Sequence, residues 1–261
     1  TVETVDRCPA IVETALNAVD VNCQEAEVNT VCYGNLMLSA QAKSGGASLL
    51  NAPGDIAAMQ EVASLKLEPL NTENDIWGIA MMRLQANMAE TLPGQAVVFL
   101  LFGDVELENR SDEETPNAFY FRSGIGDAPC AEAPDSGILV QTAEGVKEVA
   151  MEFNGVEIVL SSTAYLQAQP SADLSVSLIE GQAKVTTQNV TQTVQAGNRT
   201  TVALDDQGAA ISPPTEPEPF EAEKMAPVPV QSLERSVSVS NVMFGTRFDQ
   251  DVEGWSIFQD G

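Results

Sequence analysis

Residues 146–204, VKEVAMEFNGVEIVLSSTAYLQAQPSADLSVSLIEGQAKVTTQNVTQTVQAGNRTTVAL, decide the fold class. Short runs rich in Val, Thr and Ser recur here about every ten residues, which is the spacing of short strands joined by turns. Turn pairs such as Asn154-Gly155 and Ala196-Gly197 separate the runs. With the preceding run 138–141, the pattern predicts eight strands in an antiparallel sandwich, jelly roll or barrel-like domain.

The N-terminal half mixes one helix with further strands. Pro9 suits a first helical turn, and apolar residues follow it at helical spacing as far as Val19. Residues 59–67 fit either a short helix or a strand. The predicted strands are 36–42, 76–84, 96–107 and 118–122, with 76–84 and 96–107 joined as a hairpin by the turn at 92–95. We therefore expect an α+β domain at residues 1–130 and an all-β domain at residues 137–210.

A Pro- and Glu-rich spacer and a tail follow the β-rich region. Residues 211–229 include the run SPPTEPEP, which is typical of a stiff, extended segment. In the tail, residues 230–261, the run 236–244 (SVSVSNVMF) alternates polar and apolar residues and predicts a strand. The side chains that this strand would use for assembly are Val237, Val239, Val242 and Phe244. The predicted fold is thus mainly β, with one N-terminal helix and an extended C-terminal tail.

The charge of the chain restricts its partners. Twelve Lys and Arg face 38 Asp and Glu, so the formal net charge is −26. Nucleic acid is therefore not an expected partner, because binding to phosphates depends on Lys and Arg. The chain has no histidine, which excludes Ser-His-Asp chemistry and His-ligated zinc. No apolar run reaches the length of a membrane span, and we expect none.

Four cysteines, Cys8, Cys23, Cys32 and Cys130, form an even set without a Cys-x-x-Cys pair. Structural zinc sites and thioredoxin-like redox sites use that closer spacing, so two disulfides are the favoured interpretation. Three pairings are possible. We favour the local pair Cys23–Cys32, with Cys8–Cys130 joining the N-terminus to a later loop. Disulfides indicate an oxidising compartment, so we expect an extracellular or cell-surface protein whose signal peptide has been removed before Thr1.

Residues 137–210 resemble the FecR-type domain, an all-β module of bacterial envelope and secreted proteins. The resemblance rests on the runs 162–166 (STAYL), 174–185 (LSVSLIEGQAKV) and 194–197 (VQAG). Ser161 stands where the family commonly has glycine. The resemblance implies an extracytoplasmic location and an interaction or sensing role. Members that regulate iron uptake add a membrane segment and a cytoplasmic anti-sigma part, and we do not expect that regulatory role because neither is found here.

The tail also has the carboxylate spacing of a calcium loop. Asp249, Asp251, Glu253 and Asp260 could supply oxygen ligands, and Gly254 could supply a turn. The closing residue is Asp instead of the usual bidentate Glu, so an exposed turn is the favoured interpretation and Ca²⁺ is a weak candidate. No other cofactor is expected.

These features together favour a protein without enzymatic activity. No pair of acids stands out as a glycosidase pair, and aromatic residues, at 5% of the chain, are few for a sugar-binding cleft. We expect an extracellular structural or interaction protein that self-associates into an oligomer or polymer, such as a filament or surface layer, with its tail as a donated strand. The tail could instead fold back onto its own sheet. The alternative function is a monomeric glycan- or ligand-binding module of a larger secreted protein.

Overall fold

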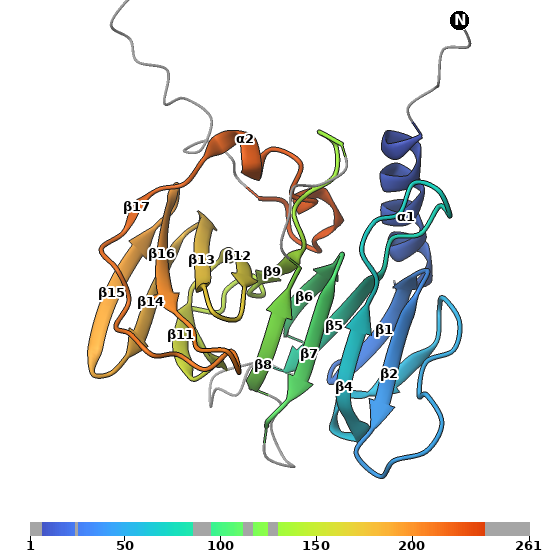
Figure 1. The fold of residues 1–261 in the computed structure, drawn as a ribbon, viewed down its shortest axis with the longest axis horizontal. Helices are drawn as coiled ribbons and strands as arrows, with labels where there is room; N and C mark the ends of the chain where they lie inside the picture. The colour runs from blue at the N-terminus through green and yellow to red at the C-terminus, as the bar shows by residue number, and fades with distance from the viewer. Residues whose placement is uncertain (1–6, 24–25, 86–94, 112–116, 125–129, 238–261) are drawn as a thin grey trace, which may run out of the picture.

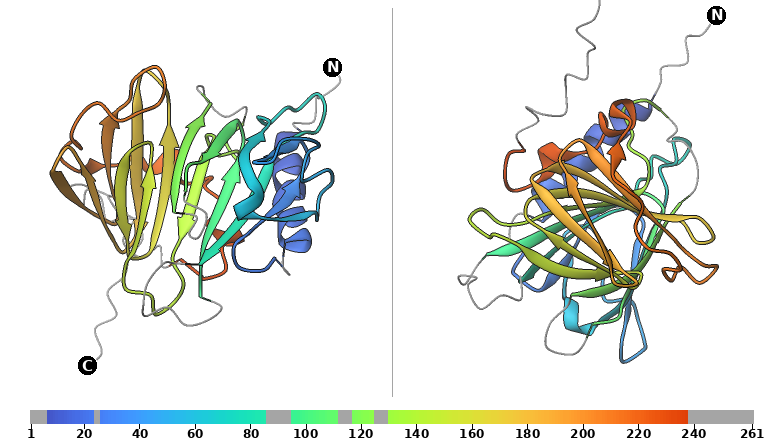
Figure 2. Two further views of the ribbon diagram at one scale, coloured as in Figure 1. Left: turned by 90° about the horizontal axis from the view of Figure 1, so that it is seen from below. Right: turned by 90° about the vertical axis from the view of Figure 1, so that its left-hand side faces the viewer.

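Two β-sheets packed face to face make up most of the molecule (Figure 1). The structure is a computed structural model, and it describes residues 7–23, 26–85, 95–111, 117–124 and 130–237. A two-layer sandwich buries one face of each sheet against the other. Figure 2 shows both layers along the sandwich and from its end. The prediction of a mainly β fold with one N-terminal helix is confirmed.

The described residues form one sheet of nine strands, here called sheet A, and one of eight strands, sheet B. The order in sheet A is β17 (Glu218–Pro219), β16 (Asn198–Ala203), β13 (Asp173–Glu180), β12 (Thr163–Ala168), β9 (Gly137–Gln141), β6 (Ala96–Phe102), β5 (Ile79–Gln85), β1 (Thr30–Asn35) and β3 (Ile56–Ala58). The order in sheet B is β15 (Val190–Gln195), β14 (Gln182–Thr187), β11 (Val156–Leu160), β10 (Val149–Phe153), β8 (Ala118–Ser123), β7 (Val105–Asn109), β4 (Val62–Leu67) and β2 (Leu38–Ala42). Neighbouring strands pair antiparallel, except that β8 and β10 run parallel.

The predicted strand 96–107 is divided between the two sheets, which corrects the sequence interpretation. β5 and β6 form the predicted antiparallel hairpin in sheet A. At Gly103 the backbone adopts φ 79°, which glycine tolerates without steric cost, and the chain crosses to sheet B as β7. The ambiguous stretch 59–67 contains both elements, because the 3₁₀ turn η1 (Met59–Glu61) leads into β4.

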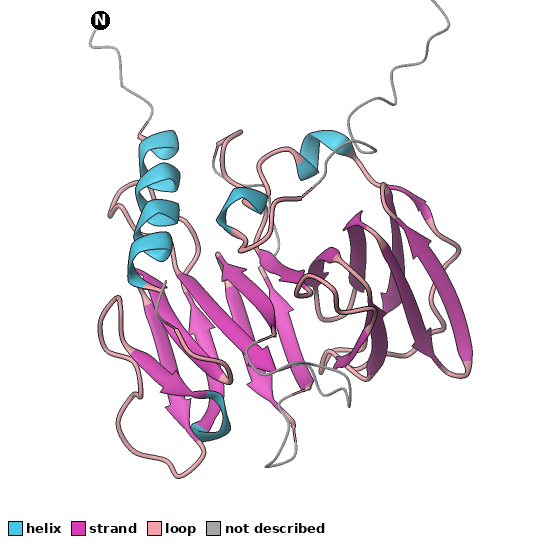
Figure 3. Cartoon of the chain, turned by 180° about the vertical axis from the view of Figure 1, so that it is seen from behind, coloured by secondary structure: helices cyan, strands magenta, loops and turns pink. Residues whose placement is uncertain are grey.

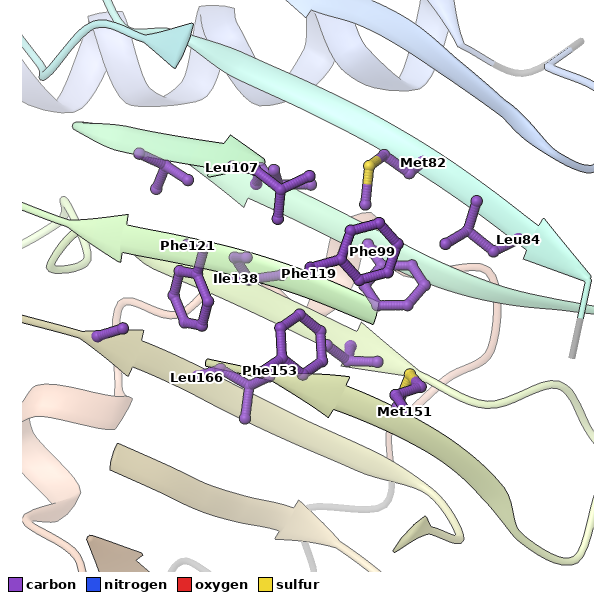
Figure 4. Packing of buried hydrophobic residues seen from close by; sticks show 14 of the residues in the cluster. Met82, Leu84, Phe99, Leu107, Phe119, Phe121, Ile138, Met151, Phe153 and Leu166 are labelled. Atoms are coloured by element: carbon purple, nitrogen blue, oxygen red, sulfur yellow. The ribbon is translucent and has the colours of Figure 1, made fainter. Parts of the chain in front are cut away.

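Both sheets cross the predicted domain boundary between residues 130 and 137. In sheet A, β9 lies between β6 and β12 and pairs with both. The core between the sheets likewise contains side chains from both halves of the chain. Phe153 lies 5.6–6.3 Å, between ring centroids, from the aromatic rings of Phe99, Phe119 and Phe121 (Figure 4). Residues before and after the boundary therefore share sheets and core.

Asn154 joins the two halves of sheet B where β8 and β10 pair over only two residues. Its side chain is buried, its Oδ1 accepts a hydrogen bond from the Phe121 amide at 3.2 Å, and its Nδ2 donates to the Phe121 carbonyl at 2.9 Å. The same Nδ2 donates to the Gly208 carbonyl at 2.7 Å. The side-chain amide of Asn154 thus links β8 to the turn at residues 205–209. It gives hydrogen-bond partners to backbone groups of Phe121 and Gly208 that burial would otherwise leave unpaired.

The outer face of sheet A is covered by helical segments from both ends of the described chain. The helix α1 (Cys8–Asn22) packs its buried residues, among them Ile11, Val12 and Val19, against this face. The second cover is the C-terminal segment, defined here as residues 222–237, which contains α2 (Ala222–Met225) and the 3₁₀ turn η2 (Val230–Ser232). Figure 3 shows α1, α2 and η2 gathered on one side of the strand layers. No helix in the described ranges is long and apolar enough to cross a membrane.

The predicted spacer packs against the sandwich. The Thr215 amide donates to the Thr201 carbonyl at 2.9 Å, and the Thr200 hydroxyl donates to the Thr215 carbonyl at 2.7 Å. Pro214 is buried. Residues 211–219 therefore run along β16 and end as the short strand β17.

Two disulfides are present, and their pairing is the one favoured from the sequence. Cys8 pairs with Cys130, and Cys23 pairs with Cys32. The first attaches the start of α1 to a residue close to β9, and the second attaches the end of α1 to β1. Both ends of the helix are therefore held to the sandwich by covalent bonds.

Candidate interaction site at the C-terminal segment

The C-terminal segment lies on an apolar surface formed by the outer face of sheet A. Val228 and Leu233 are buried there, at 3% and 8% exposure. The cluster that they join includes Trp77, Phe102 and Tyr165, and the rings of Phe102 and Tyr165 are stacked at 5.8 Å between centroids. Burying aliphatic side chains on such a surface stabilises the docked segment by about 1.5–3 kcal/mol each.

A polar cluster fixes the end of this segment. Arg235 Nη2 lies 2.6 Å from Glu180 Oε2 at the end of β13, and it also donates to the Ser162 hydroxyl at 2.9 Å. The Ser162 hydroxyl in turn donates to Glu180 Oε2 at 2.6 Å. The Arg235 and Glu180 side chains are only 26% and 19% exposed, so water screens this pair less than it screens a pair on the open surface. We call these residues, together with Gln141, the Arg235 clasp.

Gln141 holds the backbone of the same residue. Its Oε1 accepts from the Arg235 amide at 2.9 Å, and its Nε2 donates to the Arg235 carbonyl at 2.8 Å. Gln141 is 2% exposed and stands at the end of β9, directly across from Thr163. A side-chain amide can present a donor and an acceptor side by side, so it binds a peptide unit as a neighbouring strand would. The clasp therefore fixes both the backbone and the side chain of Arg235.

An adjacent ion pair adds a second attachment. Arg83 Nε on β5 lies 2.8 Å from Glu234 Oε1, and the Arg83 side chain is 21% exposed. Residues 234 and 235 thus reach two different parts of sheet A with opposite charges. The chain leaves this attachment at Val237, which is half-buried and packs against the outer-face cluster.

Replacing Arg235 with Met should weaken the docking of the C-terminal segment. Met keeps an apolar stem and removes the guanidinium, so the hydrogen bond to Ser162 and the ion pair with Glu180 are lost. Hydrogen bonds to charged groups contribute about 1.5–3 kcal/mol, and we expect a loss of that size in the free energy of unfolding. Chemical denaturation followed by circular dichroism measures it.

Lys184→Met is the matched control for this variant. Lys184 pairs with Glu148 at 2.9 Å on the open surface, where both side chains are more than 40% exposed. Exposed pairs contribute about 0–1 kcal/mol, so this control should unfold almost as the unchanged protein does. Equal losses in the two variants would contradict the structural role assigned to the Arg235 clasp.

The residues predicted to form functional sites are only partly placed. Val237 is described, whereas Val239, Val242 and Phe244 lie outside the described residues. The calcium candidates Asp249, Asp251, Glu253 and Asp260 also lie outside them. Within the described ranges, no three of the His, Cys, Asp and Glu residues are grouped so that they could hold a metal ion.

The Arg235 clasp was not predicted from the sequence. One signal was present, because Arg235 is the single cation between Lys224 and Arg247 in a chain with few cations. A lone cation in a strongly acidic chain suggests a specific acidic partner. The chain has 38 acidic residues that could pair with Arg235. Choosing among them requires the position of β13 relative to the C-terminal segment, which the local sequence pattern does not give.

Tyr165 shows how burial fixes a polar group on the same face. Its hydroxyl donates to the Asp135 carbonyl at 2.5 Å, and the residue is 3% exposed. Burial, and next the charge of Asp135, raise the pKa of Tyr165 well above its ordinary value, because both disfavour the phenolate. Tyr165 therefore stays protonated and serves as a donor that holds the chain just before β9.

A polar hollow on the outer face of sheet B is the other concave surface of interest. It has a volume of about 350 Å³, and its lining includes Glu106, Glu108, Arg110, Tyr120 and Arg122. Arg122 pairs with Glu106, and Arg110 pairs with Glu108 at 2.6 Å while its guanidinium lies 5.4 Å from the centre of the Tyr120 ring. A sugar would have to displace these pairs to reach the carboxylates and the ring.

Comparisons with known proteins give a distant structural likeness. No protein-family model and no curated protein sequence matches this chain. Two crystal structures of a "putative anti-sigma factor" from Parabacteroides distasonis ATCC 8503 are similar to part of it. The first has a TM-score of 0.38 and 8% identity over 62% of each chain. The second has a TM-score of 0.34 and 10% identity over 57% of this chain and 63% of the other. The match spans less than two thirds of either neighbour, and the FecR-type resemblance stays a prediction from the sequence.

Proposed function

We propose that this protein is a non-enzymatic, extracellular structural or interaction protein that self-associates by donating residues 236–244 as a strand. The observation that carries the proposal is the Arg235 clasp. It fixes the chain at Arg235, directly before the alternating run SVSVSNVMF. The predicted strand therefore begins at a defined point on the surface of the sandwich.

A fixed starting point favours strand donation for an entropic reason. Adding a strand to a sheet edge gains main-chain hydrogen bonds, and alternate side chains add specificity. Association also costs the entropy of ordering the donated segment, and anchoring one end of that segment in advance lowers this cost. The alternation of Val237 and Val239 with serines suits a strand with one apolar face.

The setting of this function follows from the disulfides. Cys8–Cys130 and Cys23–Cys32 would persist outside the cytosol and would be reduced inside it. A net charge of −26 keeps separate copies soluble through mutual repulsion, so a specific strand contact would be needed to join them. When each copy donates a strand to the next, the contacts are head-to-tail. Such contacts form a ring only if the rotation between neighbouring copies adds up to a full circle, and otherwise they would build an open filament or layer.

Ending the chain at Val237 should abolish assembly. We expect the unshortened chain to form oligomers or fibres in light scattering and electron microscopy, and the shortened chain to stay monomeric. The cut must follow Val237 because an earlier cut, such as one at Ser212, would remove Val228 and Leu233 and uncover the outer face of sheet A. Val239→Asp in the unshortened chain is the matched variant, since it places a charge in the donated run and leaves the docked segment intact.

Three outcomes separate the candidate functions. Strand donation is supported if the unchanged, unshortened chain assembles and both the chain ending at Val237 and the Val239→Asp variant stay monomeric. Assembly of all the chains would mean that another surface joins the copies, and strand donation would be wrong. Monodisperse monomers throughout are the result that the alternative function predicts, a glycan- or ligand-binding module of a larger secreted protein.

A further inference from the structure

Each sheet of a sandwich has two edges, and an edge can accept a strand only where its backbone groups are free and accessible. Among the strands that the structure describes, sheet A ends at β17 and β3, and sheet B ends at β15 and β2. These four edges differ sharply in length, sequence and covering.

Three of the edges are poor acceptors. β17 has two residues, Glu218 and Pro219, and proline lacks the amide that a ladder needs. β3 has three residues, which is shorter than a useful strand pairing. The edge of β2 is covered by its own loop, because the Leu49 amide donates to the Ala40 carbonyl at 3.1 Å and the Ser48 hydroxyl bonds to the same residue.

β15 is the exception. It has six residues, Val190–Gln195 (VTQTVQ), with no charge and no proline. Four of the six residues, including Thr191 and Thr193, are exposed, and Val194 is buried against the core. Edges of this kind are normally blocked by a charge, a proline, a bulge or a covering loop, because they pair readily with other chains. The right-hand view of Figure 2 faces this end of the sandwich.

The register shows which backbone groups of β15 face outward. β14 and β15 are joined by a two-residue turn at Gln188 and Asn189, with φ of 50° and 61°, as in the tight turns of hairpins. In an antiparallel pair, residues alternate between those that bond to the partner and those that bond away from it. The pair flanking the turn, Thr187 and Val190, bonds inward, so the amides and carbonyls of Thr191 and Thr193 point away from β14.

We propose that the open edge of β15 is the acceptor for the part of the run 236–244 that follows the docked residue Val237, supplied by a second copy of this chain. This inference rests on the proposed function, which names the donated strand, and it adds the surface that accepts that strand. Both members are uncharged, as VTQTVQ and SVSVSNVMF show, whereas the chain as a whole carries a net charge of −26. Pairing these two stretches joins copies without bringing acidic side chains together.

The geometry favours a second copy over the chain's own β15. The Arg235 clasp holds the C-terminal segment on the outer face of sheet A, whereas β15 is the edge of sheet B. A strand donated within one copy would have to turn from that face past residues 218–220, which lie along β16 and at the turn after β15, where the Phe220 amide donates to the Gly197 carbonyl at 3.2 Å.

Thiol cross-linking in unshortened chains tests the contact directly. A chain with Thr193→Cys is mixed with a chain carrying Val239→Cys, oxidised, and examined by mass spectrometry. We expect a covalent dimer that joins the two introduced cysteines. Gln41→Cys on β2 is the matched control, because it is an exposed residue on the opposite edge of the same sheet. Equal linking at Gln41, or linking only within a single chain that carries both Thr193→Cys and Val239→Cys, would overturn the proposal.

A proline substitution tests the hydrogen bonds. Thr193→Pro removes an outward-facing amide and leaves the inward bonds of Gln192 and Val194 to β14 in place. We expect this variant to melt cooperatively and to lose assembly, whereas Thr193→Ala, which keeps the amide, assembles normally. In the unchanged protein, amide exchange in β15 should slow by about tenfold or more on assembly, a readout that does not depend on how any variant folds.

The outcomes distinguish this inference from the function on which it rests. If the unchanged chain assembles through its tail but Thr193→Pro assembles equally well and β15 amides stay unprotected, strand donation stands and β15 is not the acceptor. If the unchanged chain does not assemble, the proposed function fails and this inference fails with it.

Discussion

Phe153→Ala is expected to lower the free energy of unfolding by about 3–5 kcal/mol, the cost of emptying a large aromatic site in a packed core. Phe153 is fully buried, and its ring lies within 6.3 Å, between centroids, of Phe99, Phe119 and Phe121. Those three partners come from β6 and β8, before residue 130, whereas Phe153 ends β10. Denaturant unfolding monitored by circular dichroism and by near-ultraviolet absorption measures the loss.

The number of unfolding transitions tests whether the two halves of the chain share one core. Because both halves of the chain share this core, the unchanged protein should unfold in a single transition, and Phe153→Ala should shift all of it. Phe153→Leu is the control, since it keeps most of the apolar volume and should cost less. A variant in which only residues after 137 unfold early would contradict the shared core.

Replacing Cys8 and Cys130 together with Ala is expected to have the largest effect of any covalent change. The bond closes a loop with a sequence separation of 122 residues. In the chain-entropy account, losing a closure of that length costs about 5 kcal/mol, because the unfolded chain gains the freedom that the bond removed. The expected result is a fall in the denaturant midpoint measured without reductant.

The second disulfide provides the comparison. Cys23 and Cys32 are separated by nine residues, and the same account gives about 3 kcal/mol for the loss of that bond. The double variant Cys23→Ala and Cys32→Ala should therefore be the more stable of the two. A reversed order would mean that the attachment of the end of α1 to β1 matters more than the length of the closed loop.

The strands of the second half could be predicted from local sequence, and the physical reason is visible in particular residues. Asn154 and Gly155 adopt φ of 55° and 78°, and Gly181 and Gly197 adopt 78° and 87°. These are the left-handed conformations that Asn and Gly tolerate best, so the turn residues marked the strand ends correctly. The turn at Asn154-Gly155 joins the paired strands β10 and β11, whereas the turns at Gly181 and Gly197 join strands that lie in different sheets.

The arrangement of the sheets could not be predicted in the same way. Residues 96–102 are uniformly apolar, so alternation does not show where that strand ends, and the pair Gly103-Asp104 is recognised as a crossing only once the two sheets are known. The parallel pairing of β8 with β10, and the place of β9 between β6 and β12, join residues far apart in the chain. Such pairings depend on which faces are left to cover, and that is a property of the whole fold.

Only part of the candidate interaction site could be predicted from the sequence. The alternating run 236–244, which follows a proline-rich stretch, predicts a strand near the C-terminus. The attachment at Arg235 was not foreseen, because Gln141, Ser162 and Glu180 come from three different strands or turns and meet only in the folded chain. Likewise, β15 has an ordinary strand sequence, and its open edge is apparent only from the order of strands in sheet B.

The C-terminal cover of sheet A has a consequence for the time during which the chain is made. A growing chain exposes its N-terminal part first, at roughly 5–20 residues per second. The cover of the outer face of sheet A is complete only when Leu233 has emerged, roughly ten seconds after Phe102 at these rates. Throughout that interval part of the apolar outer face of sheet A is accessible to chaperones and to other chains. The yield of correctly folded protein should therefore depend on how quickly its last residues follow the rest.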